Sequence, residues 1–176
     1  MTDPVANPSP LLGPRPELRL NQLLAGGNEL SVAAAESCTG GMVAARLTDV
    51  PGSSDVVLGG VVAYANEVKT AELGVAEALL TAHGAVSAEV AAAMAAGVRS
   101  RLGADVGISV TGVAGPGGGT DEKPVGLVHL HVSSPDGEKG RQFSLPGDRE
   151  AIRARATVAA LHLARTVLTR RRHEDE

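Results

Sequence analysis

Three short apolar runs, each followed by a polar or glycine-rich loop, constrain the fold of this chain more than any other feature. They occupy residues 30–36 (LSVAAAE), 56–64 (VVLGGVVAY) and 104–112 (ADVGISVTG). Runs of this length with almost no charge are typical of strands that are buried on both faces of a parallel sheet. Segments with helical spacing separate them, so the sequence predicts an α/β fold with helices on both faces of the sheet.

The remaining segments complete a three-layer α/β/α sandwich. Ser87 suits the N-cap of a long alanine-rich helix, and short helical pieces precede it. Longer helices are predicted over residues 17–25, closed by Gly26 and Gly27, and over 40–49, 88–102 and 148–168. Residues 125–134 and 140–145 flank PDGEKG, whose Asp136–Gly137 pair suits the tight turn of a β-hairpin. We therefore expect a mostly parallel mixed sheet of about five strands, one of them antiparallel.

The composition excludes several classes of protein. The 176 residues fit one compact domain over 17–169, between a flexible proline-rich leader (1–16) and a charged tail (170–176). A formal charge of −4 argues against a nucleic-acid partner. No run reaches the ~18 apolar residues of a membrane span, and no secretory signal pattern is present. With a single cysteine, the reducing cytoplasm is the expected location.

Three unusual loops follow the three predicted parallel strands. They are ESCTGG (36–41), YANEVK (64–69) and the glycine-rich TGVAGPGGG (111–119). Ligands of open α/β sheets bind beyond the carboxyl ends of the strands, so the loops predict one shared site. The third loop lacks the Gly-Lys-Ser/Thr of a Walker loop. Its backbone either lines the binding site of a phosphorylated ligand, or the loop only connects two elements of the fold.

The first loop places Ser37 beside Cys38, the only cysteine. A helix that starts near Thr39 would leave backbone N–H groups free beside the hydroxyl, where they suit an oxyanion or a phosphate. Gly40 and Gly41 allow close approach of a ligand. The alternative is a helix cap with glycines that serve packing alone.

The second loop offers Tyr64 and Lys69 as an ionisable pair. A lysine that loses its solvation can accept a serine proton, although a lone lysine is more often a solvated surface group. His129 and His131 share one face of a strand, but no third ligand lies at a useful spacing, so no metal site is expected. The sequence calls for no organic cofactor either.

Six blocks of the sequence carry a family resemblance: AESCTGG, LTDVPGSS, GGVVAYANEVK, GAVSAEVAAAMA, VTGVAGPGGGTDEKPVG and LPGDRE. Taken together, they resemble the C-terminal domain family of the competence/damage-inducible protein CinA. This family also includes stand-alone nicotinamide-nucleotide amidohydrolases of the PncC type. The resemblance covers about residues 17–168 and implies a CinA-like, anticodon-binding-domain-like fold. It also implies hydrolysis of nicotinamide mononucleotide to nicotinic acid mononucleotide and ammonia, in pyridine-nucleotide salvage.

The resemblance implies roles for particular residues. Ser37 matches the proposed nucleophile, and Tyr64 and Lys69 match the residues that assist it, with Lys69 accepting the proton directly or through Tyr64. Ala65 departs from the serine that the family often has there, which puts one hydrogen bond in doubt. The expected substrate contacts, including N–H groups around 38–41 for the oxyanion, are Cys38, Thr39, Gly40, Gly41, Asn66, Thr111, Gly112, Gly115, Gly117, Gly118 and Arg149.

Further expectations concern Arg149, the oligomeric state and a second activity. Arg149 either pairs with the substrate phosphate or stands at a helix start as a surface charge. We expect a homo-oligomer, without the pyrophosphatase-like activity of the additional N-terminal domain in longer relatives.

The rival hypothesis is a non-catalytic nucleotide-binding module of a CinA-type protein, which senses pyridine nucleotides or serves a partner in DNA uptake. Such a module would not need Ser37, Tyr64 and Lys69 together.

Overall fold

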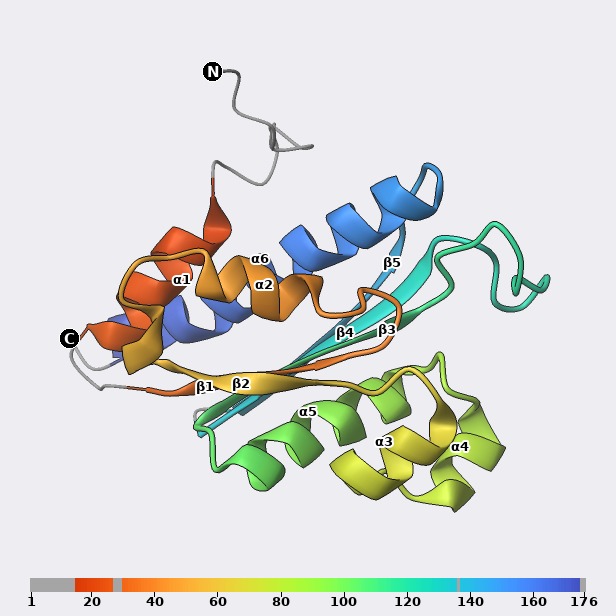
Figure 1. Ribbon diagram of the computed structural model, residues 1–176, viewed down its shortest axis with the longest axis horizontal. Coiled ribbons are helices and arrows are strands. Elements are labelled where there is room, and N and C mark those ends of the chain that lie inside the picture. The colour runs from red at the N-terminus through yellow and green to blue at the C-terminus, as the bar shows by residue number, and fades with distance from the viewer. Residues whose placement is uncertain (1–14, 27–29, 136, 175–176) are drawn as a thin grey trace.

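The protein is described here by a computed structural model that covers residues 15–26, 30–135 and 137–174, with side chains up to residue 169 (Figure 1). Nearly all of the expected leader, together with Gly27 and Asp136, lies outside the described residues. Five strands make up the sheet, namely β1 (Val32–Glu36), β2 (Val57–Val62), β3 (Val106–Gly112), β4 (Leu127–Ser134) and β5 (Gly137–Ser144). The helices are α1 (Pro16–Ala25), α2 (Met42–Thr48), α3 (Asn66–Leu73), α4 (Glu77–His83), α5 (Ala88–Leu102) and α6 (Arg149–Glu174), with a 3₁₀ turn η2 (Ser53–Asp55).

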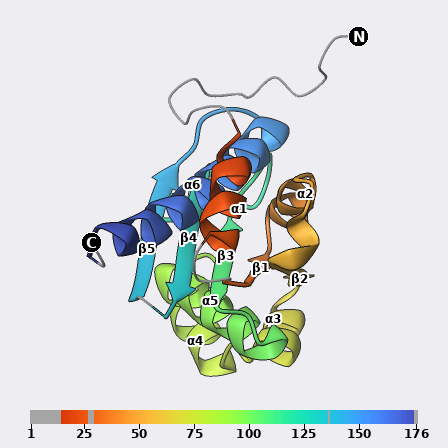
Figure 2. The same ribbon diagram turned by 90° about the vertical axis from the view of Figure 1, so that its left-hand side faces the viewer.

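The sheet has the order β2-β1-β3-β4-β5. Strand β1 pairs in parallel with β2 and with β3, whereas β4 runs antiparallel to both β3 and β5. Helices α1, α2 and α6 cover one face, and α3, α4 and α5 cover the other (Figures 1 and 2). The predicted three-layer α/β/α sandwich, with β4 as its one antiparallel strand, is confirmed.

Small residues bring the layers close together. The alanines of β1 alternate between the two cores, with Ala34 in the larger cluster and Ala33 and Ala35 in the smaller one. On the α5 side, a Cβ at Gly107 would lie 2.1 Å from the Ala95 carbonyl oxygen. A Cβ at Gly97 would lie 2.0 Å from the Leu73 carbonyl oxygen. Helix α5 therefore packs against β3 and α3 at distances that exclude any side chain there.

Strands β1, β3 and β4 each begin two residues later than predicted, and further boundaries differ as well. Strand β2 ends at Val62, after a last bond to β1 from the Ala63 N–H to the Glu36 carbonyl, because the chain then turns into α3. Strand β5 begins at Gly137, which pairs with Ser134, so the hairpin turn is shorter than PDGEKG. Helix α6 continues to Glu174, so residues 170–174 of the expected charged tail are helical. That segment contains neither glycine nor proline, and arginine favours helix.

The end of α1 and both ends of α5 agree with prediction. Helix α1 ends before Gly26, and α5 occupies residues 88–102 as expected. The Ser87 side chain caps α5 by accepting a hydrogen bond from the Val90 N–H at 3.3 Å. The carboxyl ends of β1, β2 and β3 meet at one edge of the sheet, which brings the three loops together.

Candidate active site

Ser37 stands at the carboxyl end of the central strand β1. Its own N–H donates to the Val110 carbonyl of β3 at 2.9 Å, which continues the parallel ladder by one residue. The next residues form a tight turn in which the Gly40 N–H donates to the Ser37 carbonyl at 3.1 Å. Gly40 and Gly41 have φ angles of +61° and +100°, where glycine is favoured. The turn leaves Ser37 half-buried at the edge of the sheet.

Lys69 lies in the first turn of α3, and its side chain is 1% exposed. The ammonium nitrogen Nζ donates to the Ala63 carbonyl at 2.8 Å and to the Tyr64 carbonyl at 3.1 Å. It lies 3.3 Å from the Ser37 hydroxyl oxygen. No carboxylate among the described residues forms an ion pair with it. Burial lowers the pKa of Lys69 below its usual value, and the nearby start of α3 acts in the same direction.

This geometry suits a neutral amine. A neutral amine has two N–H groups and one lone pair. When the Ala63 and Tyr64 carbonyls accept the two N–H bonds, the lone pair of Lys69 points at the Ser37 hydroxyl. The protonated form would donate to all three oxygens, so the same positions serve both states of a proton acceptor.

Cys38 is held in the core on the other side of the turn. It is 6% exposed and packs within the larger hydrophobic cluster. Burial raises the pKa of the Cys38 thiol to about 11, with a smaller contribution from the Glu36 carboxylate. A thiol that stays protonated and enclosed at neutral pH is a poor nucleophile. Of the two adjacent side chains, the Ser37 hydroxyl is the one that contacts Lys69.

Two of the four N–H groups expected to hold an oxyanion are already bonded. The Glu36 carboxylate accepts the N–H of Gly41, and the Ser37 carbonyl accepts that of Gly40. Within the described part of the chain, the N–H groups of Cys38 and Thr39 donate to no acceptor. In this conformation, the N–H groups of Cys38 and Thr39 are the ones among residues 38–41 that stay available to a ligand.

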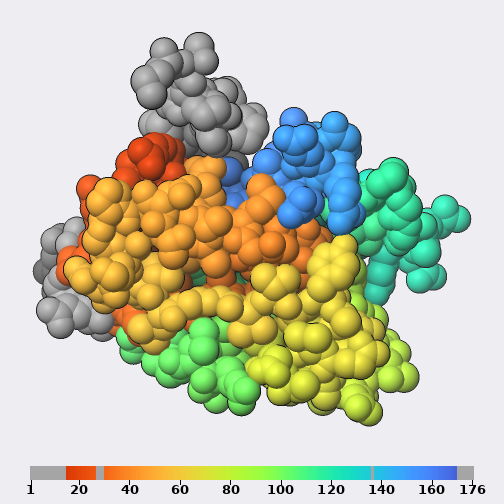
Figure 3. Space-filling view, in the orientation of Figure 1, coloured from red at the N-terminus to blue at the C-terminus, as the bar shows by residue number. Residues whose placement is uncertain are grey.

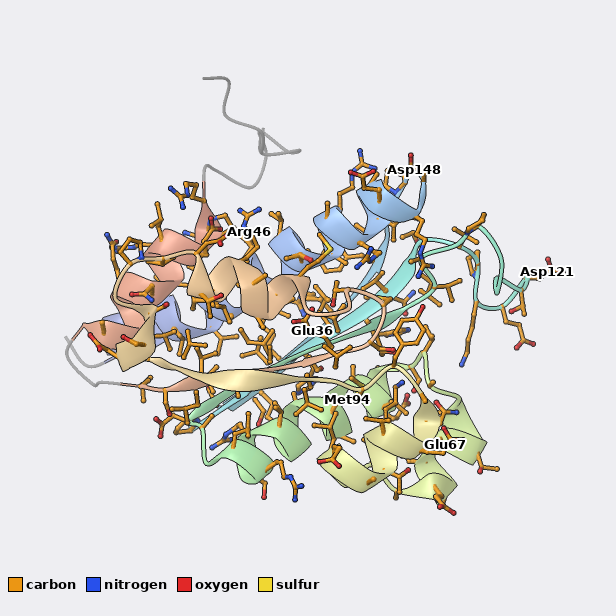
Figure 4. The ribbon with its side chains drawn as sticks, in the orientation of Figure 1. Glu36, Arg46, Glu67, Met94, Asp121 and Asp148 are labelled. Atoms are coloured by element: carbon orange, nitrogen blue, oxygen red, sulfur yellow. The ribbon has the colours of Figure 1, made fainter. Side chains whose placement is uncertain are left out.

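Tyr64 takes part in the site through its backbone. Its side chain is 60% exposed, and its hydroxyl accepts a hydrogen bond from Arg149 Nη2 at 3.0 Å. Arg149 Nη1 donates to the Gly115 carbonyl at 2.8 Å, so this side chain joins the second and third loops. Within the described residues, no hydrogen bond connects the Tyr64 hydroxyl to Ser37 or Lys69. Arg149 is exposed at the start of α6, beside the labelled Asp148 in Figure 4.

Two predicted hydroxyl contacts are not displayed on the surface. Thr111 is 1% exposed and donates to the Ala85 carbonyl at 2.7 Å, so its hydroxyl holds the chain before α5. Thr39 is fully buried, and its Oγ1 has no hydrogen-bond partner among the described residues. Thr111 is buried because β3 points its side chain toward the segment before α5. In this conformation both hydroxyls are buried.

The other residues predicted to contact the substrate differ in their position and in their exposure to solvent. Gly112 ends β3, and the Gly115 carbonyl faces Arg149. Gly117 and Gly118 are exposed in a loop that projects from the body of the molecule, with Asp121 near its tip (Figures 3 and 4). Asn66 is exposed as the first residue of α3, after Ala65 at the N-cap.

The structure also assigns two residues that the sequence did not single out. Glu36 is 1% exposed and holds the start of α2. Arg153, from α6, donates to the carbonyls of Cys38 and Thr39 at 3.1 and 3.0 Å. The signal for Glu36 was present, since a charged residue that ends a buried apolar strand must find donors. Arg153 gave no such signal, because it resembles the other arginines of an amphipathic helix.

Metal and membrane functions gain no support from the described residues. Nowhere in residues 15–26, 30–135 and 137–174 do three His, Cys, Asp or Glu side chains gather in a way that could hold a metal ion. His129 and His131 thus remain a pair on β4. None of the described helices combines the length and the apolar character needed to cross a membrane.

Fold and site together define an α/β protein in which a buried lysine faces a half-buried serine at the carboxyl edge of three parallel strands. Residues 17–168 match the CinA C-terminal domain, and the chain belongs to that family.

Relatives and solved structures agree with this assignment. The chain is 55% identical over 162 residues to a CinA-like protein of Mycolicibacterium paratuberculosis, covering 89% of this chain and 37% of that protein. It is 54% identical over 134 residues to a putative competence-damage inducible protein of Moorella thermoacetica, with 76% and 32% coverage. The chain thus spans about a third of the length of these relatives. A competence/damage inducible protein of Agrobacterium tumefaciens superposes with a TM-score of 0.82 at 39% identity, covering 88% of this chain and 96% of that one.

Proposed function

We propose that this chain hydrolyses the carboxamide of nicotinamide mononucleotide, giving nicotinic acid mononucleotide and ammonia by acyl transfer through Ser37. The observation that carries the proposal is the 3.3 Å contact between Lys69 Nζ and the Ser37 hydroxyl. Lys69 is 1% exposed and is hydrogen-bonded only to neutral oxygens. This is an unusual environment for a lysine side chain. Burial of this kind favours the neutral amine, which is the form that serves as a base.

The first half of the reaction forms an ester. The Ser37 oxygen attacks the carboxamide carbon while Lys69 takes the hydroxyl proton. The N–H groups of Cys38 and Thr39 then donate to the oxyanion of the tetrahedral intermediate. When the C–N bond breaks, the ammonium of Lys69 returns the proton to the departing nitrogen, and ammonia leaves.

The second half releases the acid. Water attacks the nicotinoyl ester of Ser37, and Lys69 takes a proton from that water. The C–O bond to Ser37 breaks, and the proton passes from Lys69 back to the serine oxygen. The products are nicotinic acid mononucleotide and the free enzyme, so atoms and protons balance without any cofactor.

Tyr64 and Arg149 suit substrate binding better than proton transfer. Their side chains are exposed and bonded to each other, while the Tyr64 carbonyl orients Lys69. The guanidinium of Arg149 is positioned near the third loop, where a phosphate is expected. We therefore assign proton transfer to Lys69 directly, and contacts with the substrate to the Tyr64 ring and Arg149.

The test is ammonia release from purified protein supplied with nicotinamide mononucleotide. Ser37→Ala should lower kcat by on the order of 10⁴-fold while the substrate still binds. Lys69→Arg should also be inactive, because a guanidinium keeps its proton at these pH values. In the wild type, kcat/KM should rise with pH through an ionisation below that of a free lysine.

Two results would contradict this assignment. An active Lys69→Arg variant would show that Lys69 supplies only positive charge. A protein that binds the nucleotide and releases no ammonia would support the rival hypothesis of a non-catalytic nucleotide-binding module. Isothermal titration with the same nucleotide separates these cases, since it measures binding independently of turnover.

A further inference from the structure

We propose that Glu36 is the positioning residue of this site. Its carboxylate fixes the turn 37–41 so that Ser37 faces Lys69 and two N–H groups stay available to the substrate. This inference rests on the proposed function for its catalytic consequence, but its structural part stands on contacts alone. Glu36 touches neither the reacting atoms nor the substrate, and it acts through the residues that it holds.

The side chain of Glu36 is fully engaged by backbone donors. Oε2 accepts the N–H of Gly41 and of Val43, both at 3.0 Å, and Oε1 accepts that of Ala44 at 2.9 Å. Figure 4 shows Glu36 between the central strand and α2. Helix α2 has no side-chain cap from its N-cap residue Gly41. The carboxylate from the preceding strand supplies those acceptors instead.

The backbone of Glu36 reaches the other half of the site. Its carbonyl accepts the Ala63 N–H at 2.8 Å, and the Ala63 carbonyl accepts the hydrogen bond from Lys69 at 2.8 Å. One residue therefore holds the turn that carries Ser37 with its side chain and the peptide that orients Lys69 with its main chain. The Ser37–Lys69 distance depends on both connections.

The carboxylate also determines which N–H groups remain free. By accepting the donors of Gly41, Val43 and Ala44, it closes the start of α2 to any anion of the substrate. The N–H groups of Cys38 and Thr39 stay outside this network. An oxyanion can thus be held only next to Ser37, where the reacting carbon must lie.

Glu36→Gln is the sharpest substitution, because it changes shape very little. The amide oxygen can replace Oε2 and accept two N–H groups, but the NH₂ then faces the Ala44 N–H, donor against donor. The matched control is Glu17→Gln. Glu17 is also 1% exposed, and it holds α2 from the opposite end through Arg46, at 2.9 Å. Both variants therefore lose a buried carboxylate that anchors α2.

The expected result is a split between the two variants. Glu36→Gln should lower kcat by roughly tenfold to 100-fold with little change in KM, since a displacement of about 1 Å in a reacting group has effects of this size. Glu17→Gln should lower the melting temperature and keep wild-type kcat below its transition. A kcat for Glu36→Gln equal to that of Glu17→Gln would overturn the inference.

Amide hydrogen exchange measured by NMR provides a readout that needs no turnover. In the wild type, the amide protons of Gly41, Val43 and Ala44 should exchange slowly, and that of Ala44 should exchange at least about tenfold faster in Glu36→Gln. Glu17→Gln should leave it unchanged. Rapid exchange of all three amides in the wild type would refute the positioning role, even if Glu36→Gln does not fold. If the wild type releases no ammonia, the proposed function fails while the exchange data still decide the role of Glu36.

Discussion

A single methyl group at Gly97 should impair the candidate site without touching it. Gly97 lies in α5 where this helix crosses the end of α3, and an added Cβ would come within 2.0 Å of the Leu73 carbonyl oxygen. Real Cβ contacts essentially never fall below 3.0 Å. Gly97→Ala must therefore separate the two helices by about 1 Å, and α3 is the helix that carries Lys69.

The sizes of the two effects can be worked out separately. Overpacking of this kind costs about 1–3 kcal/mol, and alanine recovers up to about 1 kcal/mol because it favours helix more than glycine does. The net loss of about 1–2 kcal/mol lowers the melting temperature by roughly 2–8 °C. A shift of about 1 Å in Lys69 relative to Ser37 lowers kcat by on the order of 100-fold.

Gly103→Ala is the matched control. Gly103 ends α5 with a φ of +66° and has no atom within 4 Å of a built Cβ, so alanine there adds strain of about 1–2 kcal/mol without displacing α3. Thermal unfolding and ammonia release are measured on both variants at a temperature where both are folded. Equal losses of stability with an unchanged kcat in Gly97→Ala would refute the reasoning that α5 sets the position of Lys69.

Three further predictions concern single groups. The native state binds fewer protons at Lys69 than the unfolded state does, because its pKa is lowered from 10.5. In chemical denaturation, the free energy of unfolding of the wild type should thus rise relative to that of Lys69→Met as the pH increases toward 10.5. A difference between the two proteins that does not change with pH would contradict this. Cys38→Ser should keep most of the activity, and iodoacetamide should modify native Cys38 at pH 8 on the order of 100-fold more slowly than free cysteine, unless its thiol is exposed. Ala65→Ser should add about 0.5–1 kcal/mol in a urea titration by capping α3 at the Val68 N–H, and no gain would mean that the cap does not form.

The sequence predicted most of the architecture because two independent signals agreed. Uncharged runs marked the strands, and capping residues such as Ser87 marked the helices between them. The errors lie at the ends of elements, where several outcomes differ by little free energy. Whether Gly137 belongs to a turn or a strand depends on pairing with Ser134, which is a contact between two chain segments and not a local preference.

The candidate site was predictable in its residue types and less so in their use. Ser37 and Lys69 were named from the sequence, and the structure brings them together. The hydroxyl of Thr111 was expected at the ligand and instead holds the Ala85 carbonyl. Sequence position alone does not show which polar groups are already satisfied inside the protein, because this depends on partners from other elements. The same limit hid the role of Glu36, whose donors lie five to eight residues away.

The separation of Glu36 from Lys69 is itself a chemical requirement. Both side chains are almost fully buried at the same end of the sheet, where a carboxylate and an ammonium would ordinarily pair. Such a pair would favour the charged form of the lysine and raise its pKa, which would remove the base. Among the described residues, Glu36 is instead satisfied by three peptide N–H groups and Lys69 by two carbonyls and a hydroxyl. The fold thus satisfies Glu36 with peptide donors and leaves Lys69 without an ion-pair partner, so burial can lower the pKa of the lysine.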